Sequence, residues 1–235
     1  GSVYESIKEP FVSSYTIVSS FNNLLNAFLK NKQRPILFQT SSSEMFGSID
    51  EKPLNEDSNF NPISPYANSK YYIHKMISFY RDRYDWSLSS GILFNHESEF
   101  RPDEYLIMKI INSAIQIKNR KRKSLEVGSL DLIRDWGYAG DYTLAMQMML
   151  EKNPGIDYVI GSGKGTSVKE MLNYVFGFFD MDFKEYITVN KNLLRENEPN
   201  KIVSNPDKIL NDIGWKSTTN FDEIINKCIS FKLSL

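Results

Sequence analysis

The sequence has few of the residues that mark disulfide-stabilised, metal-binding or membrane-spanning proteins. Its 235 residues include one cysteine, Cys228, which excludes an internal disulfide and fits a reducing compartment. Its two histidines show no spacing with Cys, Asp or Glu that is typical of a metal site. No apolar run is long enough to cross a bilayer, and no signal peptide is visible. We therefore expect a cytoplasmic protein with no bound metal and no membrane partner.

The chain also lacks an excess of charge of either sign. Lys and Arg number 28 and Asp and Glu number 29, so the net charge is −1 and the pI is near 6.2. The basic run at residues 118–123 has no interleaved aromatic residues, and we interpret it as a solvated loop. We therefore expect no nucleic-acid partner. An apolar content of 41% is sufficient for one large domain or two lobes around a core.

The order of the expected elements indicates an α/β fold with a parallel sheet. Amphipathic stripes and short apolar runs predict, in turn, a helix, a strand, a helix, a strand and a helix over residues 11–30, 36–39, 66–84, 88–94 and 105–117. Polar clusters follow the two strands at residues 40–44 and 95–98. Because open α/β sheets bind ligands at the carboxyl ends of their strands, these clusters are candidate site residues.

Turn and capping signals divide the rest of the chain. Residues 1–10 are irregular, residues 48–64 show no period, and Arg134–Gly137 is expected in a loop. Short strands are expected over 125–127 and 157–160. Asp141 is expected to cap a helix that runs to about residue 151. Capping boxes beginning at Ser167 and Asn220 predict two more helix starts, and Gly214 is expected to end a short helix between them.

A glycine-rich segment, Gly161–Gly165, lies between an expected strand and an expected helix. It is not Gly-x-Gly-x-x-Gly, because Thr166 stands where the third glycine would be. It is not a phosphate-binding P-loop either, because Lys164 is followed by Gly165 and not by Ser or Thr. We interpret the segment as a flexible turn into a capped helix.

The stretch from Ser64 to Lys70 holds the most informative pair of residues. Ser64 followed by Pro65 predicts a helix start, which places Tyr66 and Lys70 one turn apart on one face. An ammonium group beside a phenol favours the phenolate, so we expect the pKa of Tyr66 to fall from ~10 toward neutrality, where acid–base catalysis is efficient. The same spacing also arises by chance between surface residues.

The run Ser41–Glu44 has two interpretations, which the residues leave open. It is an ordinary turn or cap, or its hydroxyls bind a substrate oxygen while Glu44 acts as acid or base after burial raises its pKa. Of the two histidines, His96 at a strand end is the better candidate for lining a site. His74 is expected to be exposed or at a helix-packing interface.

Four segments occur in a fixed order: Ser-Ser-Ser-Glu-Met-Phe-Gly (41–47), Ser-Pro-Tyr-Ala-x-x-Lys (64–70), Gly-Ile-Leu-Phe-Asn-His-Glu-Ser (91–98) and Arg-Asp-Trp-Gly (134–137). In this order they resemble the GDP-mannose 4,6-dehydratases of the extended short-chain dehydrogenase/reductase superfamily. The resemblance implies a partial Rossmann-type, doubly wound parallel sheet plus a smaller, mostly helical substrate-binding lobe. The cofactor domain would hold residues 1–96 and 135–165, and the lobe would hold 97–134 and 166–235.

The resemblance also implies a reaction. A GDP-hexose, GDP-mannose or a relative, is oxidised at C4 by NADP (or NAD), loses water across C5 and C6, and is reduced at C6. The implied catalytic residues are Ser42, Glu44, Tyr66 and Lys70. The implied cofactor contacts are Tyr66, Lys70, Leu93, Asn95, His96 and Arg101. The implied substrate contacts are Ser43, Asn95, Lys109, Arg134 and Arg195. A homodimer or homotetramer through helices 11–30 and 66–84 is expected, with His74 at or near the interface.

The chain departs from the family pattern in two places. It has no Gly-x-x-Gly-x-x-Gly unit of the kind that holds the cofactor diphosphate, so we expect this chain alone to bind NADP weakly. Glu99–Pro102 replaces the usual Pro-Arg-Arg-Gly, with the loss of one arginine. Two alternatives therefore stay open: a GDP-sugar reductase or epimerase of the same superfamily, and a truncated, non-catalytic paralogue.

Overall fold

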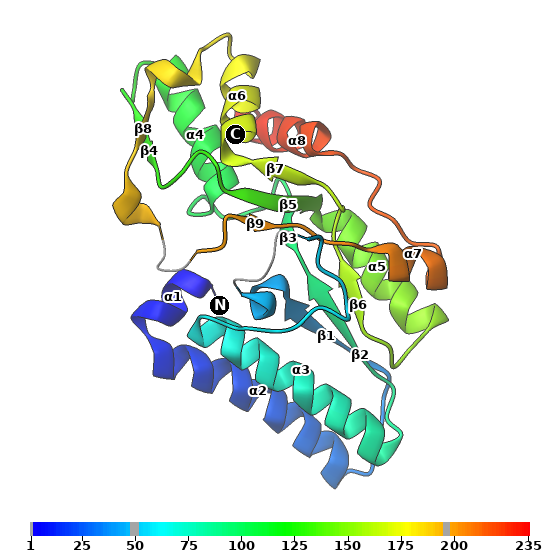
Figure 1. Ribbon diagram of the computed structural model, residues 1–235. Coiled ribbons are helices and arrows are strands. Elements are labelled where there is room, and N and C mark those ends of the chain that lie inside the picture. Colours follow the sequence, from blue (N-terminus) through cyan, green and yellow to red (C-terminus); the bar gives the residue numbers. More distant parts are fainter. Residues whose placement is uncertain (1, 48–51, 195–197) are drawn as a thin grey trace.

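A three-stranded parallel sheet lies at the centre of the computed structural model, which describes residues 2–47, 52–194 and 198–235 (Figure 1). Its strand order is β1 (Leu37–Ser42), β2 (Leu88–Leu93) and β6 (Tyr158–Ile160). Ser42 pairs in register with Leu93, and Leu93 pairs with Ile160. All three strands therefore end at one level, where the polar residues that follow them come together.

Helices cover both faces of this sheet. On one face, α2 (Pro10–Lys30) and α3 (Pro65–Tyr84) bury Phe21, Leu25, Ile73 and Ile77 with Trp86. On the other face, the cluster that includes Tyr142, Met149 and Ile209 comes from α5 (Ala139–Lys152) and α7 (Asp207–Ile213). Every residue of β2 is buried, as expected for a central parallel strand covered on both faces. The predicted doubly wound arrangement is confirmed.

A second group of elements packs around a separate apolar cluster (Figure 1). Its helices are α4 (Leu106–Lys118), α6 (Val168–Phe178) and α8 (Phe221–Leu233). Its strands are β3 (Asn95–Glu97), β5 (Ile133–Tyr138), β7 (Gly165–Ser167) and β9 (Lys201–Ile202), with β4 (Leu125–Val127) and β8 (Ile187–Val189) as a separate parallel pair. Cys228 lies in this cluster and is fully buried.

The segment Arg134–Gly137 lies in strand β5, so the prediction of a loop was wrong. Two adjacent charged residues disfavour a strand only when they lack partners. Here Asp135 accepts hydrogen bonds from the Ser162, Gly163 and Ser204 amides, and Arg134 pairs with Glu198. The hydrogen bonds to Asp135 also anchor the Gly161–Gly165 turn. The expectation of a flexible turn is therefore wrong.

Three further sequence-based expectations need correction. Residues Val3–Lys8 form helix α1, with a capping box of Ser2 and Glu5, where an irregular segment was expected. Strand β1 continues through Ser42, so part of the polar cluster lies inside the strand. Asp141 does not cap α5: it lies in the first turn and accepts hydrogen bonds from residues 217–219.

His74 is only 8% exposed, so of its two expected places the exposed one is wrong, and the residue lies where α3 packs against other parts of the chain. Its Nδ1 lies 3.0 Å from Ser90 Oγ, and its ring centroid lies 5.2 Å from that of Phe60. Residues 52–64 form no helix, and their one strand-like pairing is a single bridge at Leu54. Residues 48–51 of the expected loop lie outside the described residues.

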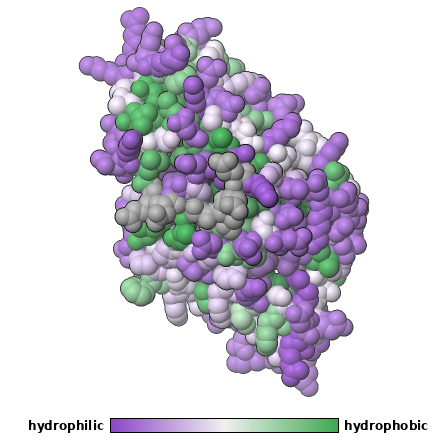
Figure 2. Space-filling view, in the orientation of Figure 1, coloured by the Kyte–Doolittle hydropathy of each residue, from purple (hydrophilic) through white to green (hydrophobic). Residues whose placement is uncertain are grey.

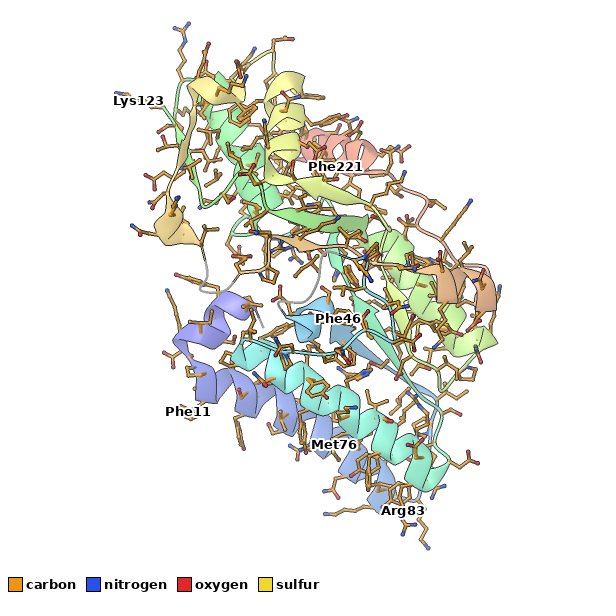
Figure 3. All side chains as sticks on the ribbon, viewed as in Figure 1. Phe11, Phe46, Met76, Arg83, Lys123 and Phe221 are labelled. Atoms are coloured by element: carbon orange, nitrogen blue, oxygen red, sulfur yellow. The ribbon has the colours of Figure 1, made fainter. Side chains whose placement is uncertain are left out.

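No described helix is both long and apolar enough to cross a bilayer. The face in Figure 2 is mostly hydrophilic, and hydrophobic residues appear there in separate patches. In Figure 3, Lys123 in the basic loop points away from the molecule, as predicted for a solvated loop.

Candidate active site

A cavity of about 470 Å³ opens where the polar ends of β1 and β2 meet the start of α3. It is lined by Ser2, Val3, Tyr4, Thr40, Ser41, Ser42, Ser43, Glu44, Tyr66, Lys70, Leu93, Phe94, Asn95, His96, Arg101 and Tyr105. The structure thus brings together the residues predicted from the strand ends and from the Tyr66 helix. No group of His, Cys, Asp and Glu among the described residues could hold a metal ion.

The N-terminus of α3 positions the phenol. Ser64 has extended backbone angles and its Oγ accepts a hydrogen bond from the Ala67 amide at 3.1 Å. Pro65 occupies the first turn, where no N–H is needed. The Tyr66 amide, another unpaired donor of this turn, donates to Ser6 Oγ of α1 at 3.1 Å. Helix α1 therefore fixes the helix end that carries Tyr66.

Lys70 does not lower the pKa of Tyr66 as the sequence predicted. Its Nζ donates to the Thr40 carbonyl at 2.8 Å and lies 5.7 Å from the Tyr66 ring centroid. Burial raises the pKa of Tyr66, and a hydrogen bond from Ser42 and the charge of Arg101 oppose that shift. Burial also lowers the pKa of Lys70. Desolvation therefore determines the direction of both pKa shifts, and it outweighs the charge interaction expected from the helical spacing.

Ser42 is the last residue of β1, and Glu44 lies in the short 3-10 helix that follows it. Ser42 Oγ accepts a hydrogen bond from the Glu44 amide at 3.3 Å, which caps the short 3-10 helix of Ser43–Phe46. Ser42 and Ser43 are buried, and Glu44 is half-buried. The turn is thus both a cap and a site element, so the two interpretations of this run are compatible.

Asn95 and His96 line the cavity from the short strand β3, which directly follows β2. His96 Nδ1–H donates to the Phe94 carbonyl at 2.9 Å, and the ring packs 5.3 Å from the Tyr142 ring. These contacts fix the orientation of the imidazole. Burial is the main reason that its pKa lies below the ordinary value. A neutral ring with Nδ1 as donor leaves Nε2 as a hydrogen-bond acceptor.

Arg101 lies at the far wall of the cavity. Its Cζ is 3.5 Å from the Tyr105 ring centroid, and its Nε is 3.3 Å from Glu97 Oε2. The Glu97 side chain is 3% exposed, and burial raises its pKa to about 7. The cavity therefore combines a fixed cation with the phenol, hydroxyl and carboxyl groups.

Two of the predicted substrate contacts, Lys109 and Arg134, are not among the described residues that line this cavity. Arg134 is 6% exposed, and its Nη2 lies 2.9 Å from Glu198 Oε1. Lys109 lies on the exposed side of α4. Arg195 lies outside the described residues. Their roles stay predictions.

Several residues of the cavity were not predicted from the sequence. Ser2, Val3 and Tyr4 were missed because their segment was read as irregular, although Ser2 and Glu5 have the spacing of a capping box. Tyr105 was counted as the first residue of a helix, while it lies just before α4. Its spacing of four residues from Arg101 gave no usable signal, because neither residue lies in a helix.

The residues present fit a nicotinamide cofactor beside a polar substrate. Tyr66, Lys70 and Asn95 offer hydroxyl, ammonium and amide groups, and Leu93 offers an apolar contact. Arg101 supplies a guanidinium that can bind a phosphate. Tyr66 and Glu44, two groups that can carry protons, line the same cavity.

Comparisons with known proteins agree with this arrangement. A family model described as GDP-mannose 4,6 dehydratase matches residues 1–228. GDP-mannose 4,6 dehydratase 2 of Arabidopsis thaliana is 35% identical over 198 residues, which cover 84% of this chain and 53% of that protein. GDP-mannose 4,6-dehydratase of Sinorhizobium fredii is 31% identical over 218 residues, 86% of this chain and 62% of that protein. The chain thus spans about half the length of the curated relatives it matches.

Solved structures show the same fold. RMD from Pseudomonas aeruginosa, in complex with NADPH, has a TM-score of 0.91 at 21% identity, covering 99% of this chain and 78% of that one. The dTDP-glucose 4,6-dehydratase DesIV from Streptomyces venezuelae, with NAD and TYD bound, has a TM-score of 0.88 at 20% identity, covering 100% of this chain and 70% of that one. The fold is therefore Rossmann-like. With a family model that spans nearly all of its length, the chain belongs to the GDP-mannose 4,6-dehydratase family of the extended short-chain dehydrogenase/reductase superfamily.

Proposed function

We propose that the chain carries the catalytic residues of a sugar-nucleotide 4,6-dehydratase that acts on GDP-mannose or a related GDP-hexose. The observation that carries the proposal is the joint presence of Tyr66, Ser42 and Glu44 in one cavity. A reductase needs an acid or base at one carbon only. A dehydratase also needs a second proton-transfer group for the neighbouring carbon, and Glu44 supplies one.

We propose NADP as the cofactor, with NAD as the alternative, because the solved relatives above hold NADPH or NAD. The bound nicotinamide would accept hydrogen from C4 of the sugar and return it at C6. Tyr66, Lys70, Leu93, Asn95, His96 and Arg101 would hold the cofactor. The Lys70 ammonium, already fixed on the Thr40 carbonyl, has further N–H donors for a ribose hydroxyl.

In this proposal each residue moves or holds one proton. Tyr66 takes the proton of the C4 hydroxyl, and Ser42 donates a hydrogen bond to the C4 oxygen. Glu44 removes the C5 proton and gives it to the C6 hydroxyl, which leaves as water. When C6 is reduced, C5 regains one proton from solvent and Tyr66 releases to solvent the proton that it took from C4. The sugar loses one water in total. Ser43, Asn95, Lys109, Arg134 and Arg195 are proposed to bind the rest of the nucleotide sugar.

We also propose that different parts of the chain bind the cofactor and the sugar. We assign cofactor binding to residues 1–96 and 135–165 and sugar binding to residues 97–134 and 166–235. The presence of separate apolar clusters supports a division into two parts, although Ile209, Ile213 and Trp215 of the second range pack in a cluster of the first and Trp136 packs in the cluster of the second.

We further propose that α2 and α3 pack against a second copy of the chain. Both helices carry exposed aromatic side chains, among them Phe11, Tyr15, Tyr72 and Phe79. Phe11 is 88% exposed and points away from the molecule in Figure 3. A second copy is the occupant that the family resemblance implies.

The activity test uses the full-length polypeptide that carries these residues. We expect incubation with GDP-mannose and NADP to give a GDP-sugar lighter by one water, detected by mass spectrometry. In heavy water the product should carry deuterium. A product of unchanged mass but altered stereochemistry would favour an epimerase, and net consumption of NADPH with a keto sugar would favour a reductase. Binding of GDP-mannose and NADP without any product would favour the non-catalytic alternative.

A further inference from the structure

Arg101 has an unusual combination of contacts. The guanidinium lies over the Tyr105 ring at 3.5 Å, and its Nε is buried 3.3 Å from Glu97 Oε2. The contact between Nε and Oε2 does not have the geometry of a hydrogen bond, and neither atom has another hydrogen-bond partner among the described residues. The carboxylate therefore holds the guanidinium mainly by charge.

The remaining donors of Arg101 are uncommitted. Within the ranges that the structure describes, no hydrogen bond joins either Nη group to a protein acceptor. Arg101 lines the cavity, so these N–H groups are available to a ligand there. A guanidinium with two free Nη groups matches the oxygens of a phosphate.

We propose that Glu97 is a positioning residue: its buried carboxylate, together with the Tyr105 ring, fixes the Arg101 guanidinium so that its Nη groups meet a phosphate in the cavity. The inference rests on the proposed function only for the identity of that ligand. Glu97 itself is not among the residues that line the cavity, so it acts on a ligand there only through Arg101.

The surroundings of Glu97 explain how one carboxylate controls the arginine. Glu97 is 3% exposed, so water cannot replace it as a partner for Arg101. The ionisable groups near it are Arg101 on the same segment and Cys228 of α8, whose thiol is neutral because burial raises its pKa to about 12. Ionised Glu97 thus has Arg101 as its counter-ion, while protonated Glu97 releases it.

Simple electrostatics and positioning predict opposite effects of Glu97→Gln. Removing a negative charge near a phosphate site should tighten anion binding if charge alone matters. If Glu97 positions Arg101, the same change should weaken it. Glu99→Gln is the matched control, because Glu99 lies two residues away, contacts Tyr138, and does not pair with Arg101.

The experiment measures binding of inorganic pyrophosphate by calorimetry at about pH 8, where Glu97 is largely ionised. We expect Arg101→Met to abolish binding, Glu97→Gln to weaken it about tenfold, and Glu99→Gln to leave it unchanged or tighter. Glu97→Asp keeps the charge but shortens the side chain, so it should also weaken binding. If Glu97→Gln does not fold, Glu97→Asp tests whether Glu97 positions Arg101.

A second readout follows Arg101 directly. In carbon-detected NMR of the guanidinium, rotation about the Nε–Cζ bond should be several-fold faster in Glu97→Gln than in the wild type. Unchanged rotation, or pyrophosphate binding as tight in Glu97→Gln and Glu97→Asp as in the wild type, would overturn the proposal. The proposal would also be overturned if the wild type bound pyrophosphate no more tightly than Arg101→Met does. Neither readout requires turnover, so a protein that passes them but makes no keto sugar would refute the proposed function alone.

Discussion

Among single residues, Glu97 shows how burial governs the chemistry of this site. Its side chain is 3% exposed, and desolvation raises its pKa from 4.5 to about 7 despite the nearby Arg101. Burial also raises the pKa of Tyr66, which moves it away from neutrality. It lowers the pKa of Lys70, which moves it toward neutrality. Helical spacing identified Tyr66 and Lys70, but it carries no information on how deeply each group is buried.

The raised pKa of Glu97 predicts a dependence of stability on pH. Between its unfolded pKa near 4.5 and its folded value of about 7, the native state binds more protons than the unfolded state. The free energy of unfolding therefore falls as pH rises through this range. The shift corresponds to ~3 kcal/mol. We expect the stability of the wild type relative to Glu97→Gln to fall by that order between about pH 4 and about pH 8.

Urea unfolding of both proteins across this range measures the difference. Glu99→Gln serves as the control, and its stability relative to the wild type should show no comparable loss. A difference between wild type and Glu97→Gln that stays constant with pH would show that Glu97 titrates normally.

Among the elements, strand β5 shows what the sequence could not reveal. The sequence predicts a loop at its Arg-Asp pair, whereas the structure has a strand there. The partners that make the strand possible come from residues 162–163, 198 and 204, distant in sequence from Asp135 and Arg134. By contrast, the helix starts at Ser64, Ser167 and Asn220 were predicted correctly because a cap depends on neighbouring residues.

Asp135 is predicted to stabilise the junction of β5, the Gly161–Gly165 turn and Ser204. Its carboxylate accepts hydrogen bonds from three amides and two hydroxyls. In Asp135→Asn the side-chain NH2 would replace one acceptor oxygen and would face N–H and O–H groups that need an acceptor. We expect the free energy of unfolding, measured in urea, to fall by about 3 kcal/mol or more. Asp131→Asn, which changes the same charge at an exposed position, should change stability by only a few tenths of a kcal/mol.

The cap of α3 links stability to the site. Ser64→Ala removes the hydrogen bond to the Ala67 amide and should destabilise the protein by about 1 kcal/mol. It should also speed amide exchange in the first turn of α3, where Tyr66 lies. Ser167→Ala removes the equivalent bond at α6 and should cost a similar amount without changing exchange at Tyr66. Equal exchange at Tyr66 in both variants would contradict this account.

For the whole molecule, the alternation of helices and strands predicted the fold class because the periodicity of each element is local. The convergence of residues 40–44, 66–70 and 93–96 was predicted from the rule that parallel strands end at one edge. The contribution of α1 to the cavity was not predictable in this way, because it depends on the packing of α1 against α3.

The proposed pairing of α2 and α3 with a second copy makes a prediction for the assembly. We expect a dimer or tetramer by analytical ultracentrifugation, and Phe11→Asp combined with Phe79→Asp should shift it toward monomer. Phe178→Asp is the matched control, because Phe178 is also an exposed aromatic but lies on α6. Dissociation by Phe178→Asp, with no effect of the α2 and α3 changes, would place the interface elsewhere.

The central claim is that Tyr66 and Glu44 act on one sugar at neighbouring carbons. The most direct test compares Tyr66→Phe and Glu44→Gln in the full-length polypeptide, with GDP-mannose and NADP, by following loss of water and deuterium uptake at C5. We expect both variants to bind GDP-mannose and to lose the dehydrated product by about 100-fold or more. Dehydration by Glu44→Gln at the wild-type rate would contradict the claim.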